Sequence, residues 1–584
     1  MKLNLRYYLT ATKMIRTFQL GTLIYFLSSI VPLNAQPCLW AKSIGGQNDD
    51  LSESITVDSK GNNYITGYFR DTVDFDPGPG IYNLTSVGHT DIFISKLNAN
   101  GDFVWAKSIG GIDFDWGNSI AVDAIGNVYT TGFFTDTVDF DPGSGIYNLT
   151  SYQFRSRYSA TFISKLDTNG NFVWAKSIGG YGRENSDCIT VDSKGNNYIT
   201  GYFIHELDFD PGVGKYYLTS AGYNDGLNDI FILKLDTNGN FVWAKRMGGV
   251  DGDWGISIAV DANENVYTTG LFEGSANFDP GTGTYNLTSA GAFDIFISKL
   301  DANGNFLWAK KMGGVNDDYG LSIAVDSDGD VYTTGCFRDT VDFDPGTGTY
   351  NLTSSGERDF FISKLDSNAN FLWAKKIGGL NDDYSSSVAV DLDGNVYNTG
   401  SFQDTVDFDP NLGTYNLTSN GKYDIFISKL DENGDFVWAK SIGGAIEDYG
   451  YSNALDSDGN VYITGDFSNT VNFIPPVLNN LISKGGRDIF VAKYSDVKVG
   501  TQETISGNNI KIYPNPTNGN FNIDLGEQLS IVEVIITDAL GQEINKKHYG
   551  DVSKLNLYIK GDPGVYFLFI KSGNKTITLK ALKQ

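Results

Sequence analysis

Residues 91–107, with the sequence DIFISKLNANGDFVWAK, decide the fold of this chain. Two apolar runs flank an Asn100-Gly101 pair, and Asn-Gly between apolar runs indicates a β-hairpin because both residues tolerate positive φ. The first run, Asp91–Leu97, is apolar on both faces instead of alternating. A strand of this kind is buried on both sides, so the sheet that contains it needs a neighbour on each face.

The hairpin belongs to a repeat that is marked by the tripeptide Trp-Ala-Lys. Successive copies begin 65, 69, 69, 65, 65 and 65 residues apart, and each contains four strand-like runs. Radially stacked blades cover both faces of such sheets, which predicts an all-β, seven-bladed β-propeller. A solenoid is the alternative, but four strands per unit exceed the usual solenoid coil. The seven copies begin at Trp40, Trp105, Trp174, Trp243, Trp308, Trp373 and Trp438.

The two ends of the repeat region predict how the ring closes. Leu39–Lys42 is a lone fourth strand with no hairpin partner before it, and Asp488–Tyr494 is a third strand with no Trp-Ala-Lys strand after it. We expect these segments to pair within a shared seventh blade, which would remove the open edges of the ring.

The repeat resembles those of bacterial seven-bladed β-propeller repeat proteins. The resemblance lies in Asp-Ile-Phe-Ile-Ser-Lys-Leu-Asp, Asn-Gly-Asn-Phe-Val-Trp-Ala-Lys, Ile-Gly-Gly and Val-Asp-Ser-Lys-Gly-Asn, and it covers roughly residues 39–496. It implies extracellular or cell-surface display and no shared reaction. The expected organisation is a signal peptide (1–35), the propeller (36–496), a linker (497–508) and a C-terminal β-sandwich (509–584).

The N-terminus has the pattern of an export signal. Basic residues precede an apolar stretch from Leu20 to Val31, and Leu33-Asn34-Ala35 offers a small-residue cleavage site. A transmembrane anchor is the alternative, although the stretch is short and nothing later in the chain is apolar enough to span a bilayer. The balance of 43 basic against 70 acidic residues gives a net charge of −27, which excludes nucleic acid as an expected partner.

The last 76 residues lose the repeat and predict short strands of a small β-sandwich. They resemble the type IX secretion C-terminal sorting domain of Bacteroidetes, through Ile-Tyr-Pro-Asn-Pro-Thr, Asp-Ala-Leu-Gly-Gln, Gly-Val-Tyr-Phe and a Lys-rich end. The resemblance implies recognition by an outer-membrane translocon, followed by release or surface attachment. An ordinary binding sandwich is the alternative. The sorting-motif residues are Tyr513, Pro514, Asn515, Pro516, Gly541, Gly564 and Tyr566.

Strand order places the tight turns on one face of the ring, and the long second-to-third loops and the Ile-Gly-Gly crossovers on the other. We call the latter the loop-rich face. Its long loops carry pairs of acids before Pro-Gly, which favour either calcium or Asp-capped turns without a metal. In the fourth copy the pair is Asn277 with Asp279, so one acid is missing, which excludes a ring of seven identical metal sites. The candidate calcium ligands are Asp74, Asp76, Asp139, Asp141, Asp208, Asp210, Asp342, Asp344, Asp407 and Asp409.

Local irregularity on the same face suggests a binding surface for a glycan or a protein. Copies two and three each carry four extra residues in their long loops, with aromatic residues and two arginines. We expect Trp116 and Trp254 in the crossovers that precede the first strands of the second and fourth copies. Such residues are favoured anchors for partners, and unselected loop variation is the alternative. The candidate ligand-binding residues are Trp116, Tyr152, Phe154, Arg155, Arg157, Tyr158, Tyr223 and Trp254.

Catalysis usually requires residues that break the repeat and converge on one point. The three histidines, His89, His205 and His548, are scattered without a partner spacing, and the repeated acids follow the symmetry of the ring. The three cysteines, Cys38, Cys188 and Cys336, fall in separate repeats and are expected as buried, unpaired thiols. We expect a binding or structural scaffold without catalytic residues. A polysaccharide-active hydrolase or lyase is the alternative.

Overall fold

The structure is a computed structural model, and it describes residues 38–151, 159–180, 184–222, 227–473, 480–496, 511–513, 517–538, 543–561, 564–572 and 575–583. The chain divides into two compact units. Cys38–Asp496 forms the first of these, and the second contains the strands after Val497. Each unit is described by itself.

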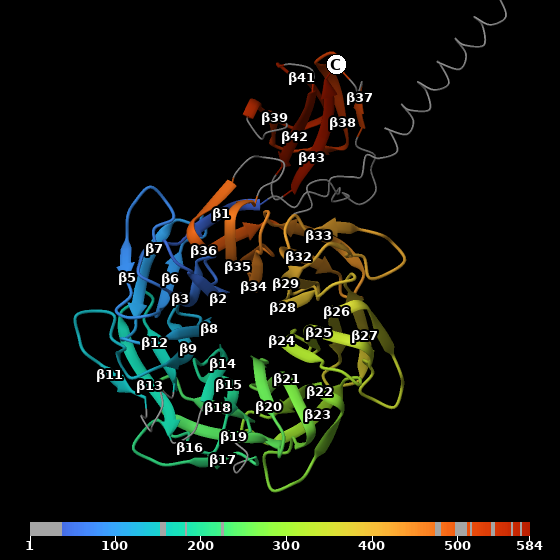
Figure 1. Ribbon diagram of the computed structural model, residues 1–584. Helices are drawn as coiled ribbons and strands as arrows, with labels where there is room; N and C mark the ends of the chain where they lie inside the picture. The colour runs from blue at the N-terminus through green and yellow to red at the C-terminus, as the bar shows by residue number, and fades with distance from the viewer. Residues whose placement is uncertain are drawn as a thin grey trace, which may run out of the picture. The chain divides into compact units, whose positions relative to one another are not determined.

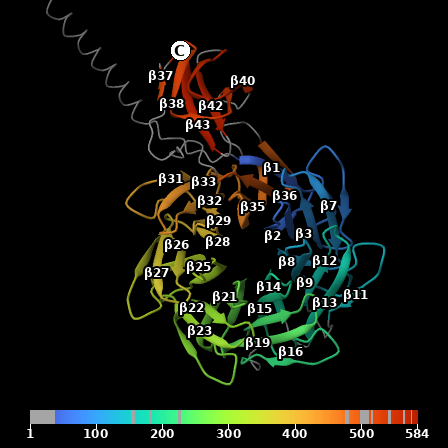
Figure 2. The ribbon, with the colours of Figure 1, turned by 180° about the vertical axis from the view of Figure 1, so that it is seen from behind.

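The Cys38–Asp496 unit is a ring of seven four-stranded antiparallel sheets around an axis, as Figures 1 and 2 show from its two sides. The strands nearest the axis are β2 (Leu51–Val57), β8 (Trp116–Val122), β14 (Glu184–Val191), β20 (Asp253–Val260), β24 (Tyr319–Val325), β28 (Tyr384–Val390) and β34 (Tyr449–Leu455). The second strands are β3 (Asn63–Phe69), β9 (Val128–Phe134), β15 (Asn197–Phe203), β21 (Val266–Asn277), β25 (Val331–Asp342), β29 (Val396–Phe402) and β35 (Val461–Asn472). The third strands are β6 (Asp91–Leu97), β12 (Ala160–Leu166), β18 (Asp229–Leu235), β22 (Asn286–Leu300), β26 (Asn351–Leu365), β32 (Asp424–Leu430) and β36 (Asn480–Tyr494). The outermost strands are β7 (Phe103–Ile109), β13 (Phe172–Gly180), β19 (Phe241–Gly249), β23 (Phe306–Met312), β27 (Phe371–Ile377), β33 (Phe436–Ile442) and β1 (Cys38–Ile44).

Between the second and third strands, the chain forms a short outlying ribbon. In four blades this ribbon is a separate pair of short strands, and in three it continues the longer second and third strands, as in β21 with β22. The separate pairs are β4 (Thr72–Asp74) with β5 (Asn83–Thr85), β10 (Thr137–Asp139) with β11 (Asn148–Thr150), β16 (Glu206–Asp208) with β17 (Tyr217–Thr219), and β30 (Thr405–Asp407) with β31 (Asn416–Thr418).

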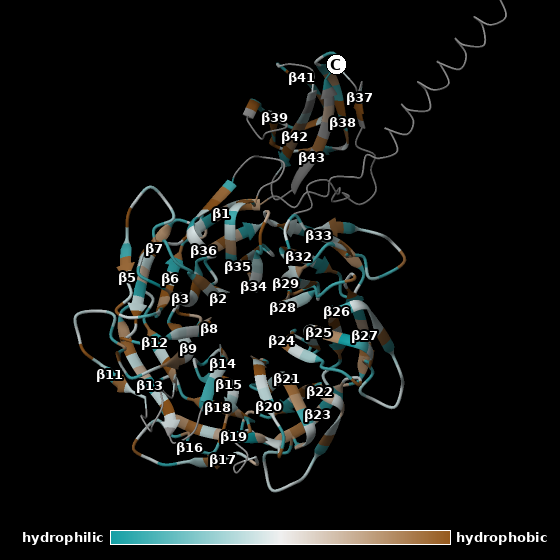
Figure 3. Ribbon diagram, viewed as in Figure 1, coloured by the Kyte–Doolittle hydropathy of each residue, from teal (hydrophilic) through white to brown (hydrophobic). Residues whose placement is uncertain are grey.

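The hydrophobic core lies between blades. Every residue of β6 is buried, as the unbroken apolar run predicted. One cluster joins Ile92 and Trp105 of the first blade to Val128 and Phe162 of the second. Apolar stretches recur along the strands of every blade (Figure 3). Each sheet therefore buries both faces against its two neighbours, and the all-β propeller fold is confirmed.

The ring closes by pairing its first described strand with its last. β1 runs antiparallel to β36, with Trp40 opposite Lys493, Ala41 opposite Ala492 and Ile44 opposite Ile489. The seventh sheet has the order β1-β36-β35-β34, so three strands come from the end of the repeat region and one from its beginning. The predicted closure is confirmed.

In every copy except that of Trp308, the tryptophan of the Trp-Ala-Lys motif donates a hydrogen bond to the next blade. The indole Nε1 of Trp105 donates to the carbonyl oxygen of Thr168, in the tight turn of the next blade, at 3.2 Å. Gly170 of that turn has a φ of 76° and lies against the Trp105 ring, where a Cβ would come within 3.0 Å of a ring carbon. The turn requires glycine for both its conformation and this close approach.

The C-terminal unit is built from two antiparallel sheets that share one hydrophobic cluster, which includes Ile523, Val534, Leu557 and Leu568. This arrangement is the predicted small β-sandwich. One sheet has the order β37 (Lys511–Tyr513), β38 (Asn520–Leu529), β41 (Val552–Tyr558), and the other has the order β40 (Glu543–Tyr549), β39 (Val532–Asp538), β42 (Gly564–Ser572), β43 (Lys575–Lys583).

Among the described turns between the third and fourth strands, one lacks its glycine, and this generates a stability prediction. Ala369 takes the place of the turn glycine and has a φ of 64°. The Nε1 of Trp308, the tryptophan of the preceding blade, has no hydrogen-bond partner among the described residues. We expect Ala369→Gly to stabilise the propeller by about 1–2 kcal/mol, because it relieves the left-handed strain of a Cβ and frees the indole to bond.

Thermal unfolding of the full chain measures the change in stability. Gly434→Ala, which makes the reverse substitution at the equivalent position of the next blade, is the matched control. Gly434 has a φ of 76°, and a Cβ there would meet the Trp373 ring at 3.1 Å. The Tm should rise for Ala369→Gly and fall for Gly434→Ala. Equal Tm values for both variants and the parent would refute the role assigned to this turn.

Candidate functional site

The seven copies act as internal controls for one another, because a group that recurs in every blade serves the architecture. The tight-turn face shows this most clearly. The Tyr64 hydroxyl donates to the Asp58 carboxylate at 3.0 Å, and the Lys96 ammonium lies 4.8 Å from the Tyr64 ring centroid. Tyr332 and Lys364 repeat the same contact at 4.9 Å. We assign this Asp-Tyr-Lys arrangement to folding.

The predicted calcium ligands on the long loops are occupied by their own backbone. Oδ1 of Asp139 accepts from the amides of Asp141 and Tyr147, at 3.0 and 2.8 Å, and Oδ1 of Asp141 accepts from Gly143 at 2.8 Å. The first of these bonds recurs in the first, third, fifth and sixth copies. In the fourth copy the neutral Asn277 makes the two bonds of its aspartate counterparts.

This pattern favours capped turns over a metal site, since the side-chain amide oxygen of Asn277 accepts the same backbone hydrogen bonds as the aspartate carboxylates. In the described part of the chain, no group of three or more His, Cys, Asp or Glu side chains is arranged to hold a metal ion. Calcium binding at these loops stays a hypothesis.

Buried carboxylates at the blade junctions hold the Ile-Gly-Gly crossovers. Asp115 is fully buried, and its two oxygens accept from the amides of Gly111 and Thr135, at 2.7 and 2.9 Å. Asp91, on the third strand of the preceding blade, is also buried, and its negative charge repels that of Asp115. Burial raises the pKa of Asp115 to about 7 and that of Asp91 to about 6.

One junction departs from the others by a paired exchange. Ala160 replaces the third-strand aspartate, and Glu184 replaces the aspartate before the next innermost strand. A Cβ on Gly179 would meet both the Glu184 carboxylate and the Ala160 methyl group. The longer side chain of Glu184 fills the volume that an aspartate at position 160 would occupy. This junction therefore stays packed with one carboxylate instead of two.

The predicted aromatic patch is only partly described. Tyr152, Phe154, Arg155, Arg157, Tyr158 and Tyr223 lie outside the described residues. Trp116 and Trp254 are described, and both differ from the prediction because they lie within the innermost strands β8 and β20 and not in the crossovers before them. A pairing with the second strand extends each strand to include them.

Both tryptophans belong to a circle of half-buried aromatic rings at the start of the innermost strands, which we call the collar. The collar consists of Trp116, Trp254, Tyr319, Tyr384 and Tyr449. Trp116 stacks on Tyr68 of the neighbouring blade, with ring centroids 4.4 Å apart. Its Nε1 donates to the Thr90 hydroxyl at 3.1 Å. The collar rings thus bridge neighbouring blades.

Arginines cover two of the tyrosines in the collar. Arg358 lies 5.3 Å from the Tyr319 ring centroid, and Arg487 lies 5.0 Å from that of Tyr449. These faces are already engaged in cation–π contacts.

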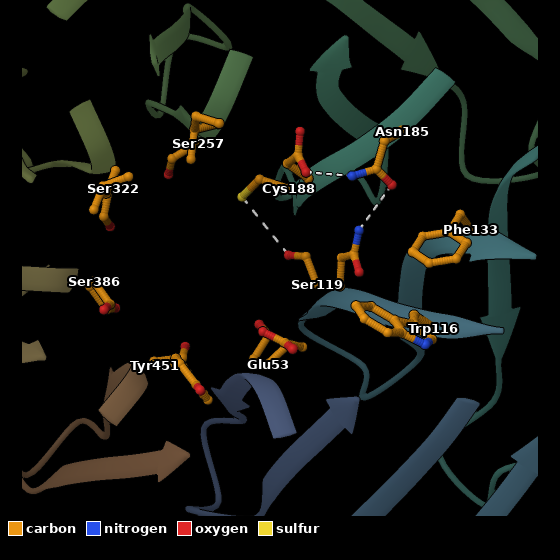
Figure 4. Close-up of a pocket in the computed structure, with 17 residues that line it drawn as sticks. Glu53, Trp116, Ser119, Phe133, Asn185, Cys188, Ser257, Ser322, Ser386 and Tyr451 are labelled. Carbon is orange, nitrogen blue, oxygen red and sulfur yellow. Dashed lines mark hydrogen bonds between the residues drawn. The ribbon is translucent and has the colours of Figure 1, made fainter. Parts of the chain in front are cut away.

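The collar adjoins a cavity of about 450 Å³ on the axis of the ring (Figure 4). Sequence reasoning did not find this cavity. The sequence feature that could have revealed it is one position on each innermost strand, two residues after the collar position. At this position the seven copies carry seven different residue types. Each blade contributes one residue there, namely Glu53, Asn118, Asp187, Ile256, Leu321, Ser386 and Tyr451.

The next position along each strand links the blades around this cavity. The Oγ of Ser54 accepts from the amide of Ile120 in the following blade at 3.3 Å, and the Oγ of Ser452 accepts from Ile55 at 3.2 Å. The serine hydroxyls form a ring of blade-to-blade hydrogen bonds. Cys188 takes the place of the serine in the third blade.

The three cysteines form no disulfide with one another, as predicted. Cys336 is buried, but Cys38 and Cys188 are only half-buried, so the prediction of full burial was wrong for these two. Cys188 lines the axial cavity, which exposes part of its surface.

The cavity is lined by polar, aromatic and aliphatic side chains from all seven blades. Asn118 donates to Asn185 at 3.2 Å, and Asn185 donates to Oδ1 of Asp187 at 2.7 Å (Figure 4). Ile256 and Leu321 belong to the fourth and fifth blades. Burial raises the pKa of Glu53 to about 7, with a smaller contribution from the Asp466 charge, and burial also raises the pKa of Asp187.

The sorting residues lie in the C-terminal unit. Tyr566 on β42 is buried, Tyr513 on β37 is exposed, and Gly564 is the first residue of β42. Pro514, Asn515, Pro516 and Gly541 lie outside the described residues.

Comparison with known proteins identifies both parts of the chain. Residues 511–584 match a family model described as a secretion system C-terminal sorting domain, and residues 372–401 match one described as a beta-propeller repeat. The chain therefore carries β-propeller repeats and a type IX sorting domain, which indicates export and attachment at the cell surface or outer membrane.

Two curated proteins resemble the chain over long stretches. An uncharacterized WD repeat-containing protein of Acanthamoeba polyphaga mimivirus is 26% identical over 540 residues, which cover 78% of this chain and 38% of that protein. The regulatory protein FlaEY of Caulobacter vibrioides is 25% identical over 306 residues, covering 48% of this chain and 30% of that protein. The chain thus spans less than two fifths of either relative.

Among solved structures, Sqt1 from Chaetomium thermophilum aligns with 73% of this chain and 96% of its own, at 10% identity and a TM-score of 0.34. Within the described ranges, the chain has no helix of the length and apolar character that a membrane crossing requires.

The junction carboxylates generate a pH prediction. Burial raises their folded-state pKa values from the ordinary 3.8 of an aspartate to about 7, so the folded chain holds more protons than the unfolded chain between about pH 4 and 7. The stability they contribute is complete below about pH 4 and is lost as the pH rises through about 7. We expect the Tm to be higher at pH 5.5 than at pH 8.5, by roughly 5 °C or more.

Thermal scans at both pH values, repeated at high salt to screen surface charge, measure this difference. The carboxylates of lowered pKa, such as Asp58, stay ionised throughout this window and do not oppose the trend. A higher Tm at pH 8.5 would contradict the assignment.

The long-loop aspartates generate a second prediction. Asp342→Asn reproduces the natural Asn277, so its Tm should stay within about 1 °C of the parent. Asp342→Ala should lower the Tm, because the amides of Asp344 and Tyr350 lose their acceptor. A chelator should leave the Tm of the parent unchanged; a fall that calcium reverses would instead establish the metal site.

Proposed function

We propose that the protein is an exported binding scaffold, displayed at the cell surface, whose loop-rich face recognises a protein or glycan partner. A signal peptide at residues 1–35 and the C-terminal sorting domain serve its delivery. The propeller is the functional part that is delivered, and it binds without chemical turnover.

The observation that carries this proposal is a set of exposed apolar side chains on the crossovers of the loop-rich face. Four crossovers expose a large aliphatic residue at the same position, which immediately follows the second glycine. The four residues are Ile112, Val250, Val315 and Leu380, with 64–77% of their surface exposed.

Aliphatic side chains at these positions do not serve the core, and exposed apolar groups with a polar rim mark interaction surfaces. They lie on crossovers that lead into the innermost strands, so they share the loop-rich face with the collar residues at the start of those strands. Aromatic residues supply most binding energy at protein interfaces and also stack on sugars.

The experiment compares binding by the full chain and by a variant in which Ile112, Val250, Val315 and Leu380 are changed to Ser. The probes are a glycan array and the outer-membrane and extracellular fractions of the producing cells, measured by pull-down. We expect the variant to lose at least about tenfold in binding, with an unchanged Tm, because the four side chains lie outside the core.

The control variant carries Ile125→Ser and Leu392→Ser. Both residues are exposed by 79% or more, and both lie on the tight turns of the opposite face. Equal losses in the two variants would overturn the assignment of the face. Release of fragments from a bound glycan would overturn the scaffold and support a polysaccharide-active enzyme.

A further inference from the structure

The axial cavity carries acidic groups that nothing in the described chain neutralises. Glu53 lines it, and no described residue donates a hydrogen bond to Glu53 or forms an ion pair with it. Asp187 also lines it. Its Oδ1 accepts from Asn185, and its Oδ2 is buried without a hydrogen-bond partner among the described residues.

Architecture does not account for these two acids. The equivalent positions in the other blades hold Asn118, Ile256, Leu321, Ser386 and Tyr451, so the blade fold requires no carboxylate there. A desolvated carboxylate without a cation is costly. The described residues that line the cavity include no Lys, Arg or His, so they supply no compensating charge.

Buried acids elsewhere are satisfied either by backbone amides, as Asp115 is, or by a cation of the chain. Asp229 has an ion pair with Arg246 at 2.6 Å, and Asp294 has one with Lys311 at 3.0 Å. Asp466, whose charge acts on Glu53, has its own ion pair with Arg487 at 3.6 Å. Where a cation is available from the chain, these carboxylates use it.

The other residues that line the cavity indicate which kind of ligand fits it. The Asn118–Asn185–Asp187 hydrogen bonds engage Oδ1 of Asp187, and its Oδ2 is buried, so Glu53 is the carboxylate that the cavity offers to a donor. Ile256 and Leu321 present aliphatic surface on the fourth and fifth blades. The volume of about 450 Å³ accommodates a small molecule or one long side chain.

From this arrangement we infer that the axial cavity binds a protonated primary amine, with its ammonium group held by Glu53, in a cavity that Asp187 makes more acidic, and its alkyl chain against Ile256 and Leu321. The inference rests on the proposed binding function and names the chemistry of its ligand. The amine is either a free aliphatic amine or a lysine side chain of a partner that covers the collar.

Isothermal titration of the full chain tests the inference with four probes. These are 1,5-diaminopentane, its neutral counterpart 1,5-pentanediol, and the acetylated peptides Gly-Gly-Lys-Gly-Gly and Gly-Gly-Gln-Gly-Gly. We expect the diamine, the lysine peptide or both to bind, and the neutral probes to bind at least about tenfold more weakly. Preference for the diamine identifies a free amine, and preference for the peptide identifies a partner's lysine.

The variant Glu53→Gln should weaken amine binding at least about tenfold, and Asp187→Asn should weaken it less, because Asp187 acts only through its charge. Neither variant should lower the Tm, because each removes a desolvated charge. Glu432→Gln is the matched control: it removes one exposed carboxylate from the opposite face, so it should change binding less than about twofold. Ile256→Trp fills the cavity without altering charge and should abolish binding.

Equal binding of 1,5-diaminopentane and 1,5-pentanediol would overturn the inference. So would equal effects of Glu53→Gln and Glu432→Gln, which would indicate unspecific attraction to an acidic protein. If no amine binds while the chain still retains a glycan or protein through its loop-rich face, the inference fails and the proposed function stands. If neither binds, both fail.

Discussion

Each blade of this propeller is buried on both faces, so a blade is stable only between two neighbours. The pairing of β1 with β36 supplies the last neighbour and turns a row of seven sheets into a ring. The ring of serine hydrogen bonds joins the seventh blade to the first, since Ser452 accepts from the amide of Ile55. Every other feature, including the cavity on the axis, exists only because this seam is closed.

Seven near-identical copies separate architecture from function without any outside comparison. The Asp-Tyr-Lys contacts, the capped long loops and the tryptophan bonds recur around the ring and hold it together. The cavity position does not recur, and it changes from acid to amide to aliphatic residue within one ring. The need to keep a blade folded cannot explain such variation at one strand position, whereas a ligand that touches several blades can.

The sequence was sufficient for the fold, since the repeat, the two-sided apolar runs and the lone end strand indicate sheets, blade number and closure. It was insufficient for the site, for two physical reasons. Trp116 lies next to the crossover in sequence, but strand pairing draws it into β8 and onto Tyr68. Glu53 and Asp187 lie 134 residues apart, and only the closed ring brings both of them to one cavity. The loop residues 152–158 fall outside the described part, so that patch stays a prediction.

Hydrogen exchange tests the closure most directly. The amides of β1 should exchange as slowly as those of β36, with which they pair, and both should exchange at the rate of global unfolding. Mass spectrometry of peptides from residues 38–44 and 488–494 in the intact chain measures this. Matched slow exchange is the result that a closed ring predicts. Rapid exchange of residues 38–44 beside a protected β36 would contradict ring closure, and with it the axial cavity that depends on a closed ring.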